Sequence, residues 1–184
     1  MPWRAETPVP APEARPPDDV VERWRATGKL AVRVRDEDGE GYRSWSAAFD
    51  WRQRQEDFRL RLSGPFGQGA LEVKGRPGAV ELKTAKGERR TARTPEELFG
   101  RRIGWDLPAS SLRHWITARA RPGTAVGDWT LDEDGRLSTL TQQGWRIEYR
   151  FPSESAGPPD LPDRVTLRGE RATVRVVVRD WRLE

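Results

Sequence analysis

Apolar side chains recur at every second position over much of the chain, a pattern typical of β-strands with one buried face. In the first such run, Leu30, Val32 and Val34 alternate with mostly charged neighbours. Short segments rich in Gly, Pro and Asp separate the runs and predict tight turns. The strands expected in the first half of the chain are 30–34, 45–51, 58–62, 71–73, 80–82 and 89–93. This order predicts an antiparallel meander with one apolar face.

Two short helices are expected in the middle of the chain. Thr94 is a typical N-cap, Pro95 suits the first helical position, and Glu97 completes the capping-box spacing. Gly100 is expected to end this helix. The second helix is expected over 110–116, where the apolar residues share one helical face.

The pattern of strands resumes after the helices. The expected strands are 129–131, 137–141, 145–151, 164–168 and 172–181. Residues 1–17 are rich in Pro and Ala without an apolar period, which predicts a flexible tether. A short amphipathic helix is expected over 18–24, and residues 18–184 are expected to form a single domain, mainly β with short helices (α+β).

The composition excludes several classes of site. The chain has no Cys and a single His, His114, so thiolate chemistry and His-rich metal sites are excluded, and no cofactor is expected. Basic and acidic residues number 33 and 29, giving a net charge of +4, and they are interleaved. This interleaving argues against a nucleic-acid partner. No apolar run is long enough to span a membrane, and neither a signal peptide nor an anchoring Cys is visible.

Candidate catalytic chemistry is sparse. The acidic segment 36–41 resembles half of a calcium loop, but Ala47 stands where the bidentate Glu is required, so this segment and 132–135 are interpreted as hairpin turns. No nucleophile elbow, phosphate loop or dinucleotide fingerprint is present, and no enzymatic activity is expected.

The segment Gly64-Pro65-Phe66-Gly67 has an unusual tip. Pro and Gly suit a type I turn between two strands, whereas Phe66 takes a position where polar residues or Gly are usual. Phe66 either folds back onto the sheet or is presented to a partner or membrane surface. The chain also has nine Trp, most of them within the apolar periodicities, where they build a core or line a cavity.

The ordered set of these segments resembles the outer-membrane lipoprotein receptor family LolB. The resemblance runs from about residue 20 to 184 and rests on Trp24, Thr27-Gly28-Lys29-Leu30, Phe49-Asp50-Trp51, Leu60 to Gly67, Leu107 to Ile116, Gln143 to Tyr149, Leu161-Pro162 and Val176 to Trp181.

The resemblance implies an unclosed antiparallel half-barrel with a helical lid over a hydrophobic cavity. It also implies that the chain binds acylated lipoproteins from a LolA-like periplasmic carrier and inserts them into the inner leaflet of the outer membrane, as a monomer on the periplasmic face and without a cofactor. Gly64, Pro65, Phe66 and Gly67 then form the membrane insertion loop. The expected cavity residues are Leu30, Val32, Trp45, Phe49, Trp51, Leu60, Leu62, Leu71, Val73, Leu98, Leu112, Trp115, Ile116, Trp145 and Ile147.

Two alternatives remain open from the residues alone. One is a lipocalin-like carrier of another small apolar ligand, and the other is a polysaccharide-binding or glycosidase domain that uses Trp platforms.

Overall fold

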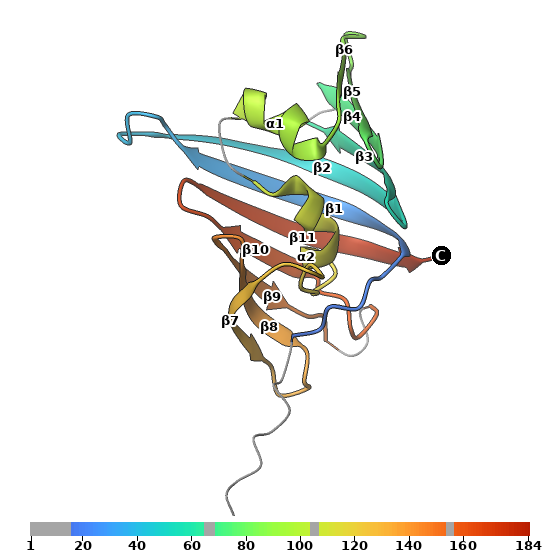
Figure 1. Ribbon diagram of the computed structural model, residues 1–184, viewed down its shortest axis with the longest axis vertical. Coiled ribbons are helices and arrows are strands. Elements are labelled where there is room, and N and C mark those ends of the chain that lie inside the picture. The colour runs from blue at the N-terminus through green and yellow to red at the C-terminus, as the bar shows by residue number, and fades with distance from the viewer. Residues whose placement is uncertain (1–15, 65–68, 104–106, 154–156) are drawn as a thin grey trace, which may run out of the picture.

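The chain forms one open antiparallel sheet of 11 strands, in the order β6-β5-β4-β3-β2-β1-β11-β10-β9-β8-β7 (Figure 1). The computed structural model describes residues 16–64, 69–103, 107–153 and 157–184, without the side chains of 101–103. The N-terminal strands β1 to β6 are Arg23–Arg35, Tyr42–Arg54, Asp57–Ser63, Ala70–Arg76, Ala79–Thr84 and Arg89–Ala92. The C-terminal strands β7 to β11 are Val126–Leu131, Leu137–Gln142, Trp145–Arg150, Arg164–Arg168 and Ala172–Leu183.

The sheet is joined at its centre by the pairing of β1 with β11, which brings the two ends of the domain together. Each half is otherwise a meander of sequential hairpins, as the alternation and the turns predict. The long strands β1, β2 and β11 are strongly curved, and the sheet wraps around the helical segments without closing (Figure 1). The expected unclosed half-barrel is therefore confirmed.

The two acidic segments form hairpin turns, as expected. Gly39 donates its N–H to the carbonyl of Asp36, and Gly135 does the same to Asp132. Both glycines have positive φ angles, 74° and 76° respectively, which few residues with a side chain adopt.

The helical segments lie across the concave face of the sheet (Figure 1). They are α1 (Pro95–Ile103), the 3₁₀ turn η2 (Ala109–Ser111) and α2 (Leu112–Trp115). Thr94 caps α1, because its Oγ1 accepts the N–H of Glu97 at 3.2 Å. The Glu97 carboxylate accepts the N–H of Arg93 at 3.1 Å, one residue before the cap.

Three helical expectations need correction. The segment expected as a helix over 18–24 has no helix, and Trp24 belongs to β1, where it pairs with Gln53 on one side and Leu183 on the other. Hydrogen bonds from both neighbouring strands outweigh the weak local helical pattern. Gly100 does not end α1, and the helix expected over 110–116 is split into η2 and the four-residue α2.

The concave face carries the apolar side chains and the convex face the charged ones. The main core cluster lies around β1, β11 and the C-terminal strands. In a smaller cluster, Leu98 of α1 packs against Val73, Val80 and Leu82 of the sheet. On the convex face, Arg25 contacts Asp50 at 2.5 Å and Arg59 contacts Glu72 at 2.6 Å. No helix of the described residues is long and apolar enough to cross a membrane.

The sheet ends in two short edge strands. Strand β6 has four residues, two of them exposed arginines, Arg89 and Arg90. Strand β7 pairs with β8 in an irregular register that shifts between Val126 and Trp129.

Gly28 lies where β1 changes register against β11, and the β11 backbone approaches it closely there. The register shifts between Thr27 and Gly28, and a Cβ at position 28 would lie 1.9 Å from the Val177 carbonyl oxygen. Only a residue without a side chain fits, since the obstacle is backbone.

We expect Gly28→Ala to lower the free energy of unfolding by about 2 kcal/mol or more, because the two central strands must separate to admit the methyl group. Gly100→Ala is the matched control, since nothing lies within 4 Å of a Cβ there and the position is helical. Urea titration followed by Trp fluorescence measures both variants. Equal stability of the two variants would contradict the role assigned to Gly28.

Candidate functional site

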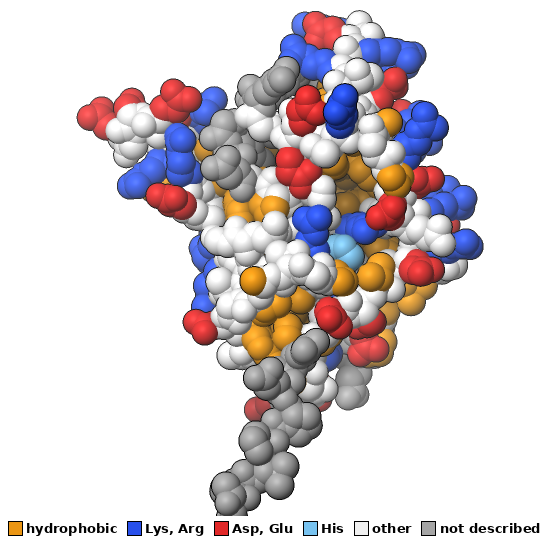
Figure 2. Space-filling model, in the orientation of Figure 1, with side chains coloured by type: hydrophobic (Ala, Val, Ile, Leu, Met, Phe, Trp, Pro, Cys, Tyr) orange, Lys and Arg blue, Asp and Glu red, His pale blue; other side chains and the backbone are white. Residues whose placement is uncertain are grey.

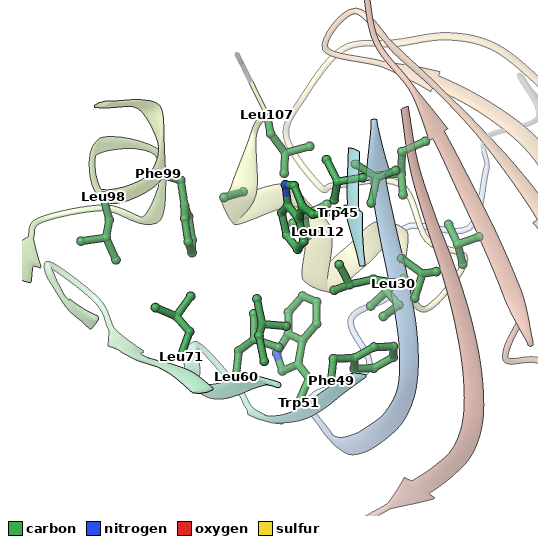
Figure 3. Close-up of a pocket in the computed structure, with 18 of the residues that line it drawn as sticks. Leu30, Trp45, Phe49, Trp51, Leu60, Leu71, Leu98, Phe99, Leu107 and Leu112 are labelled. Carbon is green, nitrogen blue, oxygen red and sulfur yellow. The ribbon is translucent and has the colours of Figure 1, made fainter. Parts of the chain in front are cut away.

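A hydrophobic cavity of about 360 Å³ lies between the concave face of the sheet and the helical segments (Figure 3). Its volume falls within the range of small-molecule sites, about 300–1,000 Å³. Leu98 and Phe99 of α1 project toward Leu60 and Leu71 on the opposite strands. The lining residues are Leu30, Val32, Trp45, Phe49, Trp51, Leu60, Leu62, Leu71, Leu82, Leu98, Phe99, Leu107, Ala109, Leu112, Ile116, Val165, Leu167, Val174 and Val176. All of them are apolar.

The structure places most of the expected cavity residues on this wall. Those from the sheet are Leu30, Val32, Trp45, Phe49, Trp51, Leu60, Leu62 and Leu71, and those from the helical segments are Leu98, Leu112 and Ile116. The sheet residues come from β1 to β4, where alternation puts every second side chain on the concave face.

Four expected cavity residues lie in the packed core instead. Val73 is fully buried in the small cluster beneath α1, and Trp115 of the lid is fully buried in the main core cluster. Trp145 covers Gly169, where an added Cβ would lie 2.7 Å from the indole ring, and Ile147 is fully buried on β9. Alternation assigns a residue to a face of the sheet, but packing depth decides whether it reaches an open space.

Several cavity residues were not expected. They are Leu82, Phe99, Leu107, Ala109, Val165, Leu167, Val174 and Val176. The four from the C-terminal hairpin show the same alternation as the N-terminal strands, so the signal was present. Their place beside β1 follows from the β1–β11 pairing, for which the sequence has no local signal.

The expected membrane loop is only partly described. Gly64 follows β3, whereas Pro65, Phe66 and Gly67 lie outside the described residues.

The lid segment η2–α2 is attached to the sheet by one buried and one exposed hydrogen bond. Trp115 Nε1 donates to Gln142 Oε1 at 2.9 Å, and Arg113 Nη1 donates to the Gln55 carbonyl oxygen at 2.9 Å. The lid is also joined to α1, because Glu96 accepts the N–H and the hydroxyl of Ser110 at 2.7 and 2.8 Å. These contacts hold Leu112 and Ile116 over the cavity.

His114 on α2 is buried and lies beside two cations. Arg113 Nε donates to His114 Nε2 at 3.1 Å, so this ring nitrogen acts as an acceptor. Burial first, and then the positive charges of Arg113 and Arg121, lower the pKa of His114 from 6.5 to about 4. The imidazole is therefore neutral at physiological pH.

The cavity wall can shelter an apolar chain, and its described lining residues include no group for acid–base or nucleophilic chemistry. Within the described part of the chain, no group of three or more His, Asp or Glu side chains could hold a metal ion. The arrangement is that of a binding site whose affinity comes from apolar burial.

Comparisons with known proteins agree with this description. The sequence profile of the family "Outer membrane lipoprotein LolB" matches residues 22–181. The outer-membrane lipoprotein LolB of Pseudomonas savastanoi pv. phaseolicola is 40% identical over 161 residues, covering 88% of this chain and 75% of the relative. The LolB of Halorhodospira halophila is 38% identical over 158 residues, covering 86% and 74% respectively.

A solved structure shares the fold. The crystal structure of a LolA superfamily protein from Nitrosomonas europaea aligns with a TM-score of 0.54 at 8% sequence identity, covering 91% of this chain and 88% of the other. At this identity the likeness concerns the fold alone.

The depressed pKa of His114 predicts a pH-dependent stability. Between about pH 4 and pH 6.5 the unfolded chain binds a proton that the folded chain does not, so the free energy of unfolding falls as the pH is lowered through this window. We expect His114→Gln to remove about 2 kcal/mol of the change between pH 7 and pH 5. Urea titrations of both proteins at the two pH values measure it. An identical pH dependence would show that His114 is not buried as a neutral group.

Proposed function

This chain belongs to the outer membrane lipoprotein LolB family, and we propose that its cavity receives the acyl chains of lipoproteins and passes the lipoproteins on to a membrane. The observation that carries the proposal is the uniformly apolar wall between the lid and the sheet. A wall without charged groups suits methylene chains, which offer no hydrogen bonds and bind by burial alone.

Apolar burial supplies the energy for such a relay. At about 0.8 kcal/mol per methylene, a chain of about sixteen carbons gains roughly 12 kcal/mol when it leaves water. A lipoprotein therefore needs a protein that shields its chains between membranes. A receptor that binds the chains more tightly than the carrier, and less tightly than a bilayer, moves cargo in one direction without a cofactor or a catalytic group.

We propose that the donor is a LolA-like periplasmic carrier and that delivery is to the inner leaflet of the outer membrane, with the protein monomeric on the periplasmic face. The name "outer-membrane lipoprotein" of the relatives supports this location. We further propose that residues 1–17, which are rich in Pro, act as a tether for a single domain formed by 18–184.

We also propose that Phe66 contacts the membrane during delivery. It occupies the centre of the segment Gly64-Pro65-Phe66-Gly67 between β3 and β4. An aromatic ring suits the interfacial region of a bilayer, where one side is apolar and the other hydrated.

Transfer from a carrier tests the cavity. A triacylated lipoprotein loaded on a LolA-like carrier is expected to move onto this protein, whereas its unacylated form is not. Leu62→Glu is expected to reduce the uptake by about ten-fold or more, because a carboxylate in the apolar wall either loses its hydration or draws water in.

Val177→Glu is the matched control for this variant. Val177 is 38% exposed and alternates with the cavity residue Val176, so it faces away from the cavity. Co-purification of the labelled lipoprotein with each variant measures uptake. Uptake by Leu62→Glu at the level of Val177→Glu would refute the cavity as the acyl site, and uptake of free lipids in preference to acylated proteins would favour a small-ligand carrier.

Phe66→Glu should separate uptake from delivery. We expect normal uptake of the acylated lipoprotein and loss of its transfer to vesicles, because a carboxylate does not enter the bilayer interface readily. Vesicle flotation after mixing with the loaded receptor measures the delivered fraction. Delivery at the unsubstituted level would remove Phe66 from the mechanism.

A further inference from the structure

A second pocket of about 260 Å³, lined by both apolar and polar side chains, adjoins the apolar cavity at the end where the β2–β3 and β4–β5 turns meet the lid. Its inner wall is shared with the cavity, since Trp51, Leu60, Phe99, Ala109 and Leu112 line both spaces. Figure 3 shows four of these side chains, Trp51, Leu60, Phe99 and Leu112, around the apolar space. The two spaces thus lie on either side of the same five side chains.

The outer wall of this pocket is basic. Arg76, Arg93, Arg113 and Arg121 line it, and the single acidic lining residue is the exposed Glu56. In Figure 2 basic side chains flank the pale blue His on the face that carries the helical segments. Glu96 and Glu97 lie at the margin of the pocket, where they accept hydrogen bonds from the lining residues Ser110 and Arg93. Four guanidinium groups against these two carboxylates and Glu56 still leave a small excess of positive charge.

The four arginines differ in how far their charges are already satisfied. Arg113 bonds His114 and the Gln55 carbonyl and lies 3.7 Å from Glu56, and Arg121 donates to the Ser111 hydroxyl at 3.1 Å. Arg76 and Arg93 are exposed, and within the described part of the chain neither side chain has an ion pair or a hydrogen bond. Two guanidinium groups at the mouth are thus open to an anion.

Two of these arginines also act on the neighbouring histidine. Burial is the main cause of the lowered pKa of His114, and the positive charges of Arg113 and Arg121 lower it further.

We propose that the cavity and this arginine-lined pocket together form a site for a diacyl glycerophospholipid, with the acyl chains against the apolar wall and the phosphate at the arginines. Guanidinium groups pair with phosphate oxygens through two parallel hydrogen bonds, which is the strongest recognition of a phosphate that a side chain offers. The ligand class differs from the acylated proteins of the proposed function, although it uses the same apolar wall.

Calorimetric titration with short-chain, monomeric lipids tests the assignment. The probes are dihexanoyl phosphatidylglycerol, dihexanoylglycerol with the same chains and no phosphate, and glycerol phosphate without chains. The phospholipid is expected to bind about ten-fold more tightly than the diacylglycerol, the difference that one charge-assisted contact provides. Glycerol phosphate alone is expected to bind too weakly to detect.

The double variant Arg76→Gln/Arg93→Gln is expected to abolish this ten-fold preference and to leave the affinity for dihexanoylglycerol unchanged. Arg175→Gln/Arg179→Gln is the matched control, because it removes the same charge from exposed positions of β11 that alternate with the buried Val174, Val176 and Val178. The control variant is expected to keep the preference.

Several outcomes would overturn the proposal. These are equal affinities for the two lipids, an equal loss of both affinities in the Arg76/Arg93 variant, or loss of the preference in the control. Binding of glycerol phosphate as tightly as the phospholipid would instead assign the arginines to a free phosphate. Lipoprotein transfer, measured in parallel, separates this inference from the proposed function, since either activity can be present without the other.

Discussion

The amide of Gln142 lies buried at the junction of the lid and the sheet, and both of its polar atoms are satisfied. Its oxygen accepts hydrogen bonds from Trp115 Nε1 and the Arg121 backbone, and its nitrogen donates to the carbonyls of Arg121 and Thr124. A buried amide that lost these partners would cost about 1–3 kcal/mol for each unsatisfied group. These hydrogen bonds therefore hold α2 and the segment that follows it against β8.

The position of the lid determines which residues of the concave face pack in a core and which line the cavity. Trp115 of the lid packs with the C-terminal strands in the main core, and beneath α1 a second small cluster forms. Between them the curved sheet and the raised lid leave the apolar space that the lining residues share. The same attachment brings Arg113 to the β2–β3 turn, so that the apolar space opens beside a basic rim. The attachment of η2–α2 thus positions both the apolar residues over the cavity and Arg113 beside it.

Alternation and turn residues predicted the meander because each hairpin is a local structure whose turn carries its own signal. They also placed Leu71 and Val73 on the same face, correctly, but only Leu71 reaches the cavity, while Val73 is covered by α1. Trp24 was predicted in a helix because its pairing partners, Gln53 and Leu183, come from distant parts of the chain. The hydrogen bonds between Gln142 and the lid, and the four arginines that line one pocket, likewise depend on tertiary structure. The sequence has no local pattern that predicts them.

An unclosed sheet leaves two strands with unpaired backbone groups, and such edges invite strands from other molecules. Strand β6 has only four residues and carries Arg89 and Arg90, and strand β7 is irregular where it pairs with β8. Short length, positive charge and broken register are the features by which natural sheets resist edge-to-edge addition. An open sheet of this kind can hold cargo without aggregating through its edge strands. The features that prevent aggregation lie at the two edges of the sheet, away from the cavity.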